Sequence, residues 1–119
     1  MASYTFPRDV RILNSREFDK VFKNPIRVSA PGILILACKN KNIGFARLGL
    51  VVPKKVLKRA VWRNRVKRLV RESFRLSQHT LPEVDLVFLA KPKIGEMDNT
   101  ELTMALQKLW KKISLRLEK

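Results

Sequence analysis

The residues with the clearest chemical potential are cationic. Between Lys54 and Arg75 stand ten lysines or arginines and one acid, Glu72. On a helical wheel the polar side chains gather on one side: Asn64, Lys67, Arg68, Arg71 and Arg75, flanked by Arg63 and Arg65. Arginine can hold a phosphate through two parallel hydrogen bonds. The spacing therefore predicts a phosphate-binding helix face, and the excess of one charge disfavours the alternative, a merely solvated surface.

Aromatic side chains offer a second kind of contact. Phe18 and Phe22 stand four residues apart, so they share one face of a predicted helix. Such a pair is usually core, but it can also form a surface on which unpaired bases stack. Trp62 and Trp110 lie on the apolar sides of their predicted helices. We expect both tryptophans to be buried.

Side chains for catalysis or metal binding are sparse. The single histidine, His79, falls at the end of the basic helix, where a surface position suits it. One cysteine, Cys38, excludes an intrachain disulfide and makes a cysteine-based zinc site very improbable. The paired acids stand in predicted turns, and the four glycines form no phosphate-binding loop: Glu83 with Asp85, and Glu96 with Asp98. A self-contained active site is not expected.

Length and charge limit the possible classes of protein. The chain has 119 residues, which suits a single domain. A formal net charge of +16 comes with a hydrophobic fraction of 45%, so a small folded core under a positive surface is expected. We find no apolar stretch long enough to span a bilayer and no signal peptide. These features predict a cytoplasmic protein with a nucleic-acid partner.

The elements that must position these residues can be read from apolar spacing. The pattern predicts an α+β sandwich in which helices pack on a small mixed sheet. Lys39 to Asn42 is predicted to be a hairpin turn between two strands, and Asp98 with Glu101 forms a capping box. The apolar side of the basic helix comprises Trp62, Val66, Leu69 and Val70, with Ser73 and Leu76 beside them. Helices are expected at 15–23, about 58–78 and from Asp98 onward, and strands at 33–38, 44–52 and 85–90, with another near 26–28.

Several of these segments together resemble a known family. The main motifs are the run Leu48 to Lys55 and the run Arg63 to Arg75, which contains the sequence Arg-Asn-Arg-x-Lys-Arg. Further matches cover nearly the whole chain in the right order: Phe6-Pro7-Arg8, Arg11-Ile12-Leu13, Glu17 to Phe22, Asp85-Leu86-Val87 and Leu106 to Trp110. The sequence is similar to the bacterial ribonuclease P protein component.

The resemblance implies a fold and a role. The fold would be a two-layer α+β sandwich of about four mixed strands and three helices, like the second domain of a small-subunit ribosomal protein. A left-handed crossover would join the strands on either side of the basic helix, although about 98% of such connections are right-handed. The protein would assist a catalytic RNA, which with Mg²⁺ removes the 5′ leader of precursor tRNA. The Mg²⁺ would be bound mainly by RNA, and no catalytic residue, membrane or obligate protein partner is expected.

The resemblance also implies binding residues. The basic helix would contact the catalytic RNA through Arg63, Asn64, Arg65, Lys67, Arg68 and Arg71. A cleft would take the single-stranded leader through Phe18 and Phe22, with Arg11, Arg47, Lys54 and Lys55 as additions. Some members place an aromatic residue on the first long strand, where this chain offers only Leu36. The alternatives are a ribosomal or other structural RNA-binding protein, a protein-only nuclease and, more distantly, a DNA-binding architectural protein.

Overall fold

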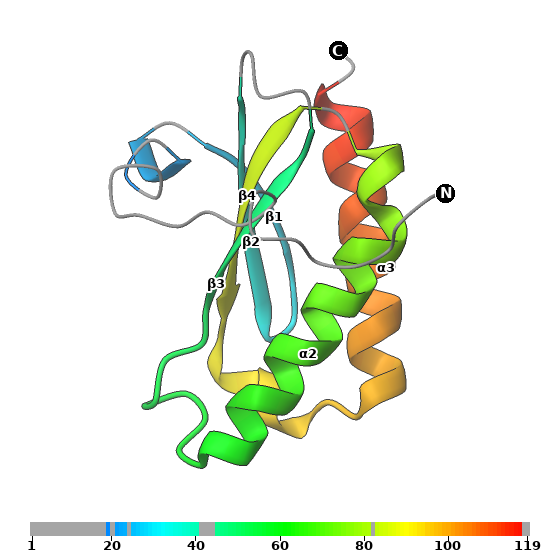
Figure 1. The fold of residues 1–119 in the computed structure, drawn as a ribbon. Helices are drawn as coiled ribbons and strands as arrows, with labels where there is room; N and C mark the ends of the chain where they lie inside the picture. The colour runs from blue at the N-terminus through cyan, green and yellow to red at the C-terminus, as the bar shows by residue number, and fades with distance from the viewer. Residues whose placement is uncertain (1–18, 20, 24, 41–44, 82, 118–119) are drawn as a thin grey trace.

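The computed structural model describes residues 19, 21–23, 25–40, 45–81 and 83–117. Figure 1 shows one sheet with two long helices beside it. The predicted strands and helices are present, with ends shifted by a few residues. The elements in chain order are β1 (Ile26–Ala30), β2 (Ile33–Lys39), β3 (Arg47–Val51), α2 (Ala60–Ser77), η2 (Gln78–Thr80), β4 (Val84–Ala90), η3 (Pro92–Glu96) and α3 (Asn99–Leu117).

The sheet order is β1-β2-β4-β3. β1 pairs with β2 and β2 with β4 in the antiparallel sense, whereas β3 and β4 are parallel. The prediction that residues 39–42 join two neighbouring strands as a hairpin is therefore wrong. β4 takes the place beside β2 because its side chains are buried on both sheet faces, which suits a central strand.

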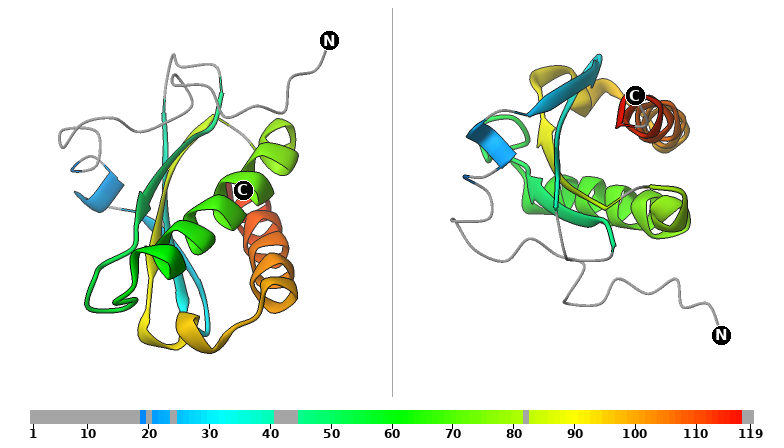
Figure 2. Two further views of the ribbon diagram at one scale, coloured as in Figure 1. Left: turned by 60° about the horizontal axis from the view of Figure 1, so that its bottom comes forward. Right: turned by 90° about the horizontal axis from the view of Figure 1, so that it is seen from above.

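The connection from β3 to β4 runs through α2. Because β3 and β4 are adjacent and parallel, this connection is a crossover, and the views in Figures 1 and 2 show it to be left-handed. This agrees with the resemblance and departs from the common right-handed form. The crossover places the basic helix along one face of the sheet, beside the strands that precede and follow it.

Both long helices cover the same face of the sheet, as the view from above in Figure 2 shows. α2 buries Val66, Val70 and Phe74 there, and α3 buries a matching row of leucines with Trp110. The ring of Trp110 meets that of Phe74 edge-on, with centroids 6.0 Å apart. Its indole N–H donates to the Ser73 hydroxyl at 2.8 Å. These contacts join the two helices and confirm that Trp110 belongs to the core.

Two predictions about the apolar side of α2 are wrong. Trp62 is 46% exposed and Leu76 is 53% exposed, although both share a side of the helical wheel with buried residues. Both stand near an end of α2. The wheel gives the direction of a side chain but not whether another element lies opposite it. Phe74, which the wheel did not assign to this side, is fully buried there.

The opposite face of the sheet carries a smaller apolar cluster. Val21, from the helical residues 21–23, is buried against Leu36 of β2 and Val87 of β4. This contact anchors the helical segment predicted at 15–23, of which residues 19 and 21–23 are described. Leu36 is buried beneath it and offers no exposed wall to a ligand.

Two local features fix the ends of elements. Gly32, in the turn from β1 to β2, has a φ of +82°. An added Cβ there would lie 2.8 Å from the backbone nitrogen of Ile94, so only glycine fits. At the start of α3 the Glu101 N–H donates to the Asp98 carboxylate at 2.8 Å, and the Asp98 N–H donates to Glu101 at 3.2 Å. The predicted capping box is confirmed.

Candidate RNA-binding surfaces

The exposed side of α2 presents a cationic stripe. Asn64, Arg68 and Arg71 are all solvent-exposed and stand four and then three residues apart, so they follow one line along the helix. No acidic residue occupies the first turn, and no side chain caps the helix at Arg59. The positive end of the helix dipole therefore adds to the charge of the side chains. An anion approaching this stripe meets positive potential along its whole length.

Arg63 supports the loop that leads into α2. One terminal nitrogen, Nη1, donates to the carbonyls of Leu57 and Lys58, each at 2.8 Å. These bonds satisfy carbonyl groups just before the helix and fix the angle at which the chain enters it. Arg63 is half-buried as a result, as is Lys67 on the same helix. Of the six residues predicted to contact the catalytic RNA, these two are less accessible than the stripe.

Arg65 joins α2 to the start of α3. Its Nη1 donates to Asn99 Oδ1 at 3.2 Å, and its Nη2 donates to the carbonyl of Met97 at 3.4 Å. Its Nε is buried and has no hydrogen-bond partner in the described part of the chain. The side chain is therefore held in one orientation before any ligand arrives.

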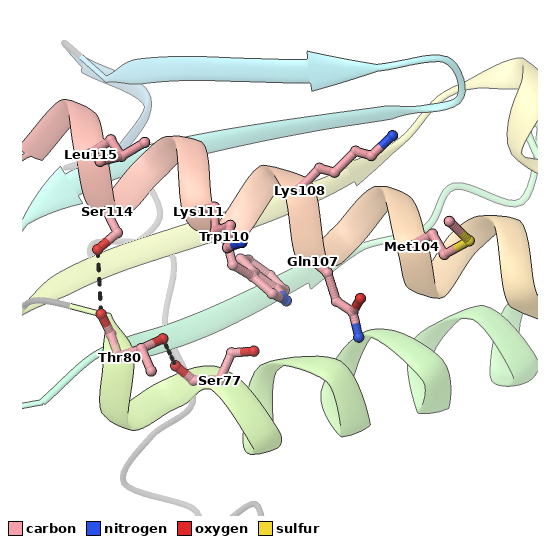
Figure 3. A pocket seen from close by; sticks show the side chains of 9 residues that line it. All are labelled: Ser77, Thr80, Met104, Gln107, Lys108, Trp110, Lys111, Ser114 and Leu115. Carbon is pink, nitrogen blue, oxygen red and sulfur yellow. Dashed lines mark hydrogen bonds between the residues drawn. The ribbon is translucent and has the colours of Figure 1, made fainter.

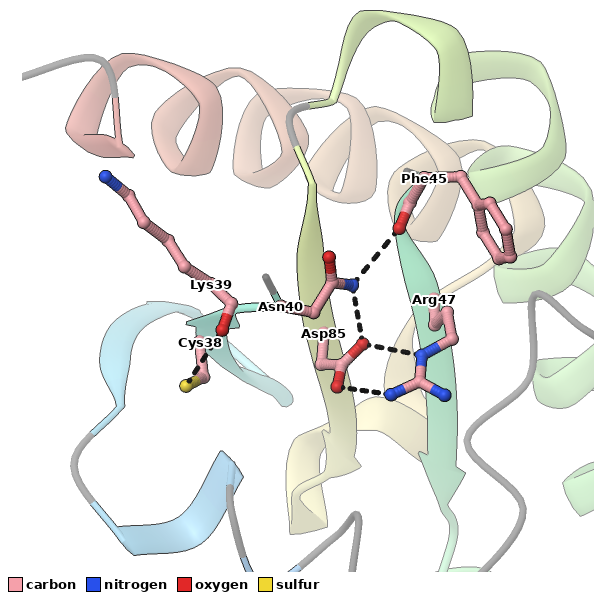
Figure 4. A network of polar contacts seen from close by, with 6 residues as sticks. All are labelled: Cys38, Lys39, Asn40, Phe45, Arg47 and Asp85. Atoms are coloured by element: carbon pink, nitrogen blue, oxygen red, sulfur yellow. Dashed lines mark hydrogen bonds and ion pairs between the residues drawn. The ribbon is translucent and has the colours of Figure 1, made fainter. Parts of the chain in front are cut away.

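Arg47 lies on the other face of the sheet, in the network of Figure 4. Its Nε and Nη2 hold the two oxygens of Asp85 at 2.9 and 2.8 Å, across the parallel pair of β3 and β4. Asn40 donates to the same carboxylate at 2.8 Å and to the carbonyl of Phe45 at 3.1 Å. A fork-shaped pair of this kind fixes both position and plane of the guanidinium. The structure thus ties Arg47 to a buried acid, which sequence spacing did not indicate.

Lys54 and Lys55 occupy the turn that follows β3. The N–H groups of Val56 and Leu57 both donate to the carbonyl of Pro53, at 3.0 and 3.1 Å, which closes the turn. Both lysines are exposed on it. They stand close in sequence to the start of α2, at the end of the sheet where β3 finishes (Figure 1).

Phe22 projects from the helical segment on the second sheet face. It is 45% exposed, whereas its neighbour Val21 is buried. The segment therefore uses Val21 for packing and presents Phe22 at the surface. Phe18 and Arg11, the other predicted leader contacts on this side, lie outside the described residues.

Comparison with known proteins places this fold and these surfaces in a family. The profile of the family Ribonuclease P matches residues 6–114. The chain belongs to the ribonuclease P protein family. A ribonuclease P protein component of Haemophilus influenzae is 54% identical over 112 residues, which cover 94% of this chain and 93% of the relative.

Solved structures of the ribonuclease P protein have the same fold. The Staphylococcus aureus RNase P protein superposes with a TM-score of 0.80 at 27% identity, covering 92% of this chain and 95% of its own. The Thermotoga maritima RNase P protein gives a TM-score of 0.76 at 31% identity, with coverages of 87% and 96%. Membership makes the chain a protein subunit of ribonuclease P, a tRNA-processing endoribonuclease, and its four-stranded mixed sheet is that of the family.

Other features predicted for a ribonuclease P protein can be placed as well. His79 is exposed in η2, as expected for a residue at a helix end. No three His, Cys, Asp or Glu side chains gather as metal ligands among the described residues. None of the described helices is both long and apolar enough to cross a membrane.

A groove that sequence analysis did not predict lies between α3 and the end of α2 (Figure 3). Its volume is about 740 Å³, and it is lined by Ser77, Thr80, Met104, Gln107, Lys108, Trp110, Lys111, Ser114 and Leu115. The Ser114 hydroxyl donates to the carbonyl of Thr80 across one end, at 3.3 Å. The groove mixes apolar side chains with two lysines and shares no residue with the cationic stripe.

Proposed function

We propose that this chain is the protein cofactor of a ribonuclease P ribonucleoprotein, which removes the 5′ leader of precursor tRNA. Membership of the family and the one-sided charge of α2 support the proposal. The observation that carries it is the exposed stripe of Asn64, Arg68 and Arg71 on a helix whose other side is locked into the core. A rigid helix offers phosphate groups a fixed row of partners, which a disordered basic segment could not.

In this proposal the catalytic RNA docks on α2. Arg68 and Arg71 contact phosphates, and Asn64 supplies an amide that can both donate and accept hydrogen bonds. Arg63 and Arg65 orient the surface through their bonds to backbone carbonyls and Asn99, and contact RNA with their remaining donors. Lys67 contributes charge from its half-buried position. Binding through phosphates predicts a strong dependence on salt.

The leader would bind on the side of the sheet that carries Phe22. An exposed aromatic ring can stack on any unpaired base, so a leader of any sequence would be accepted. Lys54 and Lys55 would hold leader phosphates, and Phe18 and Arg11 complete the set proposed from the family resemblance. Because Asp85 already holds Arg47 through two nitrogen atoms, we assign to Arg47 mainly the shaping of this surface.

The chemistry of cleavage is assigned to the RNA. Mg²⁺ bound by RNA would activate water and stabilise the leaving oxygen. The protein's own contribution is electrostatic, since its cationic surfaces reduce the repulsion between two polyanions that must approach closely. Both RNA partners would be met in the cytoplasm, without a second protein.

A cleavage assay at low Mg²⁺ tests the proposal. Precursor tRNA is incubated with the protein, with a bacterial ribonuclease P RNA, and with both. We expect efficient removal of the leader only in the mixture. A mixture no faster than the RNA would overturn the proposal and favour the alternative, a structural RNA-binding protein of another assembly. Cleavage by the protein without RNA would instead reveal a nuclease.

The leader contact has its own test in Phe22→Leu. We expect weaker binding of precursor tRNA, by roughly the 1–3 kcal/mol typical of one stacked base, and unchanged binding of mature tRNA. Because Phe22 is half exposed, stability should change little, which a denaturant titration checks. Equal losses for precursor and mature tRNA would remove Phe22 from the leader surface.

A further inference from the structure

The first turn of α2 carries an aromatic ring that the fold does not use. Trp62 is 46% exposed, and the guanidinium carbon of Arg59 lies 5.2 Å from its ring centroid. A cation at this distance over an indole is attracted by the ring's negative face. The contact holds the ring in place while nearly half of the side chain still faces solvent.

Trp62 also borders a depression between α2 and the start of α3. The depression measures about 430 Å³, within the range of roughly 300–1,000 Å³ typical of small-ligand sites. Its lining combines apolar, cationic and amide side chains: Val61, Trp62, Asn64, Arg65, Arg68, Leu69 and Asn99. Arg65 is already fixed here by Asn99, and its buried Nε finds no partner in the described part of the chain. The site is therefore built before any ligand binds.

The chemistry of this lining suits one class of ligand. An aromatic ring stacks on a nucleobase, an arginine holds the attached phosphate, and an amide can read the edge of the base. A base inside an RNA duplex cannot reach the ring, so the ligand must be unpaired. The net positive charge of the rim favours a nucleotide over an apolar protein segment, since the depression lines up with Arg68 of the cationic stripe.

We propose that Trp62 is a stacking platform for one unpaired nucleotide of the partner RNA, with Arg59 holding the ring and Arg68 binding the phosphate. This inference rests on the proposed function, because it assumes that α2 docks on RNA. It adds a contact that depends on base stacking to a surface otherwise governed by charge. The two kinds of contact can be separated by their response to salt.

The test compares Trp62→Ala, Trp62→Phe and a control, Leu115→Ala, which truncates another exposed apolar side chain on α3. The Kd for a bacterial ribonuclease P RNA is measured at several salt concentrations. We expect Trp62→Ala to weaken binding roughly 5- to 150-fold, the range for one stacked base. The salt slope should not change because no charge is removed. Trp62→Phe should recover most of the loss, and Leu115→Ala should bind like the wild type.

Tryptophan fluorescence gives an independent reading. Only Trp62 and Trp110 can emit, and Trp110 is 2% exposed, so the signal lost in Trp62→Phe belongs to Trp62. We expect RNA to quench that signal and to leave the Trp110 signal unchanged.

Each outcome has a separate meaning. Wild-type protein that fails to bind the RNA would overturn the proposed function. Wild-type binding together with an unaffected Trp62→Ala, or equal losses in Trp62→Ala and Leu115→Ala, would overturn only the stacking platform. Sedimentation without RNA completes the test, since a self-association that Trp62→Ala abolishes would identify the patch as a protein interface instead.

Discussion

Trp62 and Trp110 have the same side chain and the same helical prediction, yet they end in opposite environments. Trp110 fits between α2 and α3, with its ring against Phe74 and its N–H on Ser73. Trp62, one turn into α2, meets only Arg59 and the rim of an open depression. Around Trp110 the two helices press on the sheet and on each other. Around Trp62 the helix has a neighbour only at Asn99, the first residue of α3.

The difference separates two tasks along a single helix. The buried residues Val66, Val70 and Phe74 hold α2 rigid, and that rigidity gives the exposed stripe its fixed spacing. A side chain at the end of the helix can then point toward the core in angle and still reach solvent in fact. Stability should therefore depend on the region around Trp110, and RNA binding on the region from Trp62 to Arg71.

The largest effect expected from this comparison is on stability. Trp110→Ala removes a buried aromatic side chain and should lower the free energy of unfolding by about 3–5 kcal/mol. Trp62→Ala should change it by no more than about 0.5 kcal/mol, because the residue is half exposed. Urea titrations followed by circular dichroism measure both. Equal losses in the two variants would contradict the assignment of Trp62 to the surface.

A smaller effect should follow from the partner of Trp110. Ser73→Ala leaves the buried indole N–H without an acceptor, which should cost about 1–3 kcal/mol of stability. Ser114→Ala is the matched control, since its hydroxyl makes a longer bond of 3.3 Å near the surface. If Ser73→Ala destabilised the protein no more than Ser114→Ala, the hydrogen bond between the helices would contribute little to their packing.

The exposed side of α2 is tested by charge. In the double variant Arg68→Ala with Arg71→Ala, the logarithmic dependence of RNA affinity on salt should weaken by about one unit for each phosphate that is no longer neutralised. Stability should stay within about 0.5 kcal/mol. Lys111→Ala with Lys112→Ala removes the same charge from exposed positions on α3 and should change the slope less. Equal slopes in the two double variants would mean that total charge, and not the stripe, sets binding.

Much of this division could be predicted from the sequence. The spacing of Val66 and Val70 gives the buried side of α2, and Asp98 with Glu101 marks the start of α3. The exposed line of Asn64, Arg68 and Arg71 follows from the same periodicity. These features are local, so a wheel and capping rules suffice to find them.

The features that sequence could not predict depend on residues far apart in the chain. Nothing near β3 indicates that β4 separates it from β2, and nothing near Arg47 indicates Asp85 as its partner. Arg65 reads as part of the charged face until Asn99 and Met97 are seen to hold it. Trp62 belongs to the same group, because its exposure is decided by the element that does not lie opposite it.

The smallest predicted effect concerns the only acid on α2. Glu72 accepts a bond of 2.6 Å from Arg75, and both side chains are accessible enough to make this a surface pair. Glu72→Gln should therefore change stability by less than about 1 kcal/mol. It also removes one negative charge beside Arg71 and weakens the hold on Arg75, so RNA affinity at low salt should rise about two- to fivefold.

The salt dependence of that gain decides what it means. Repulsion between Glu72 and RNA phosphates is screened beyond about 10 Å at 0.1 M salt, so the gain should fade as salt rises. Glu96→Gln, in the exposed η3, removes the same charge from a position outside α2 and serves as the control. A gain seen only in Glu72→Gln would extend the RNA-binding stripe to the last turn of α2. Equal gains in both variants would end the stripe at Arg71, and would leave the final turn to the packing between α2 and α3 that Trp110 represents.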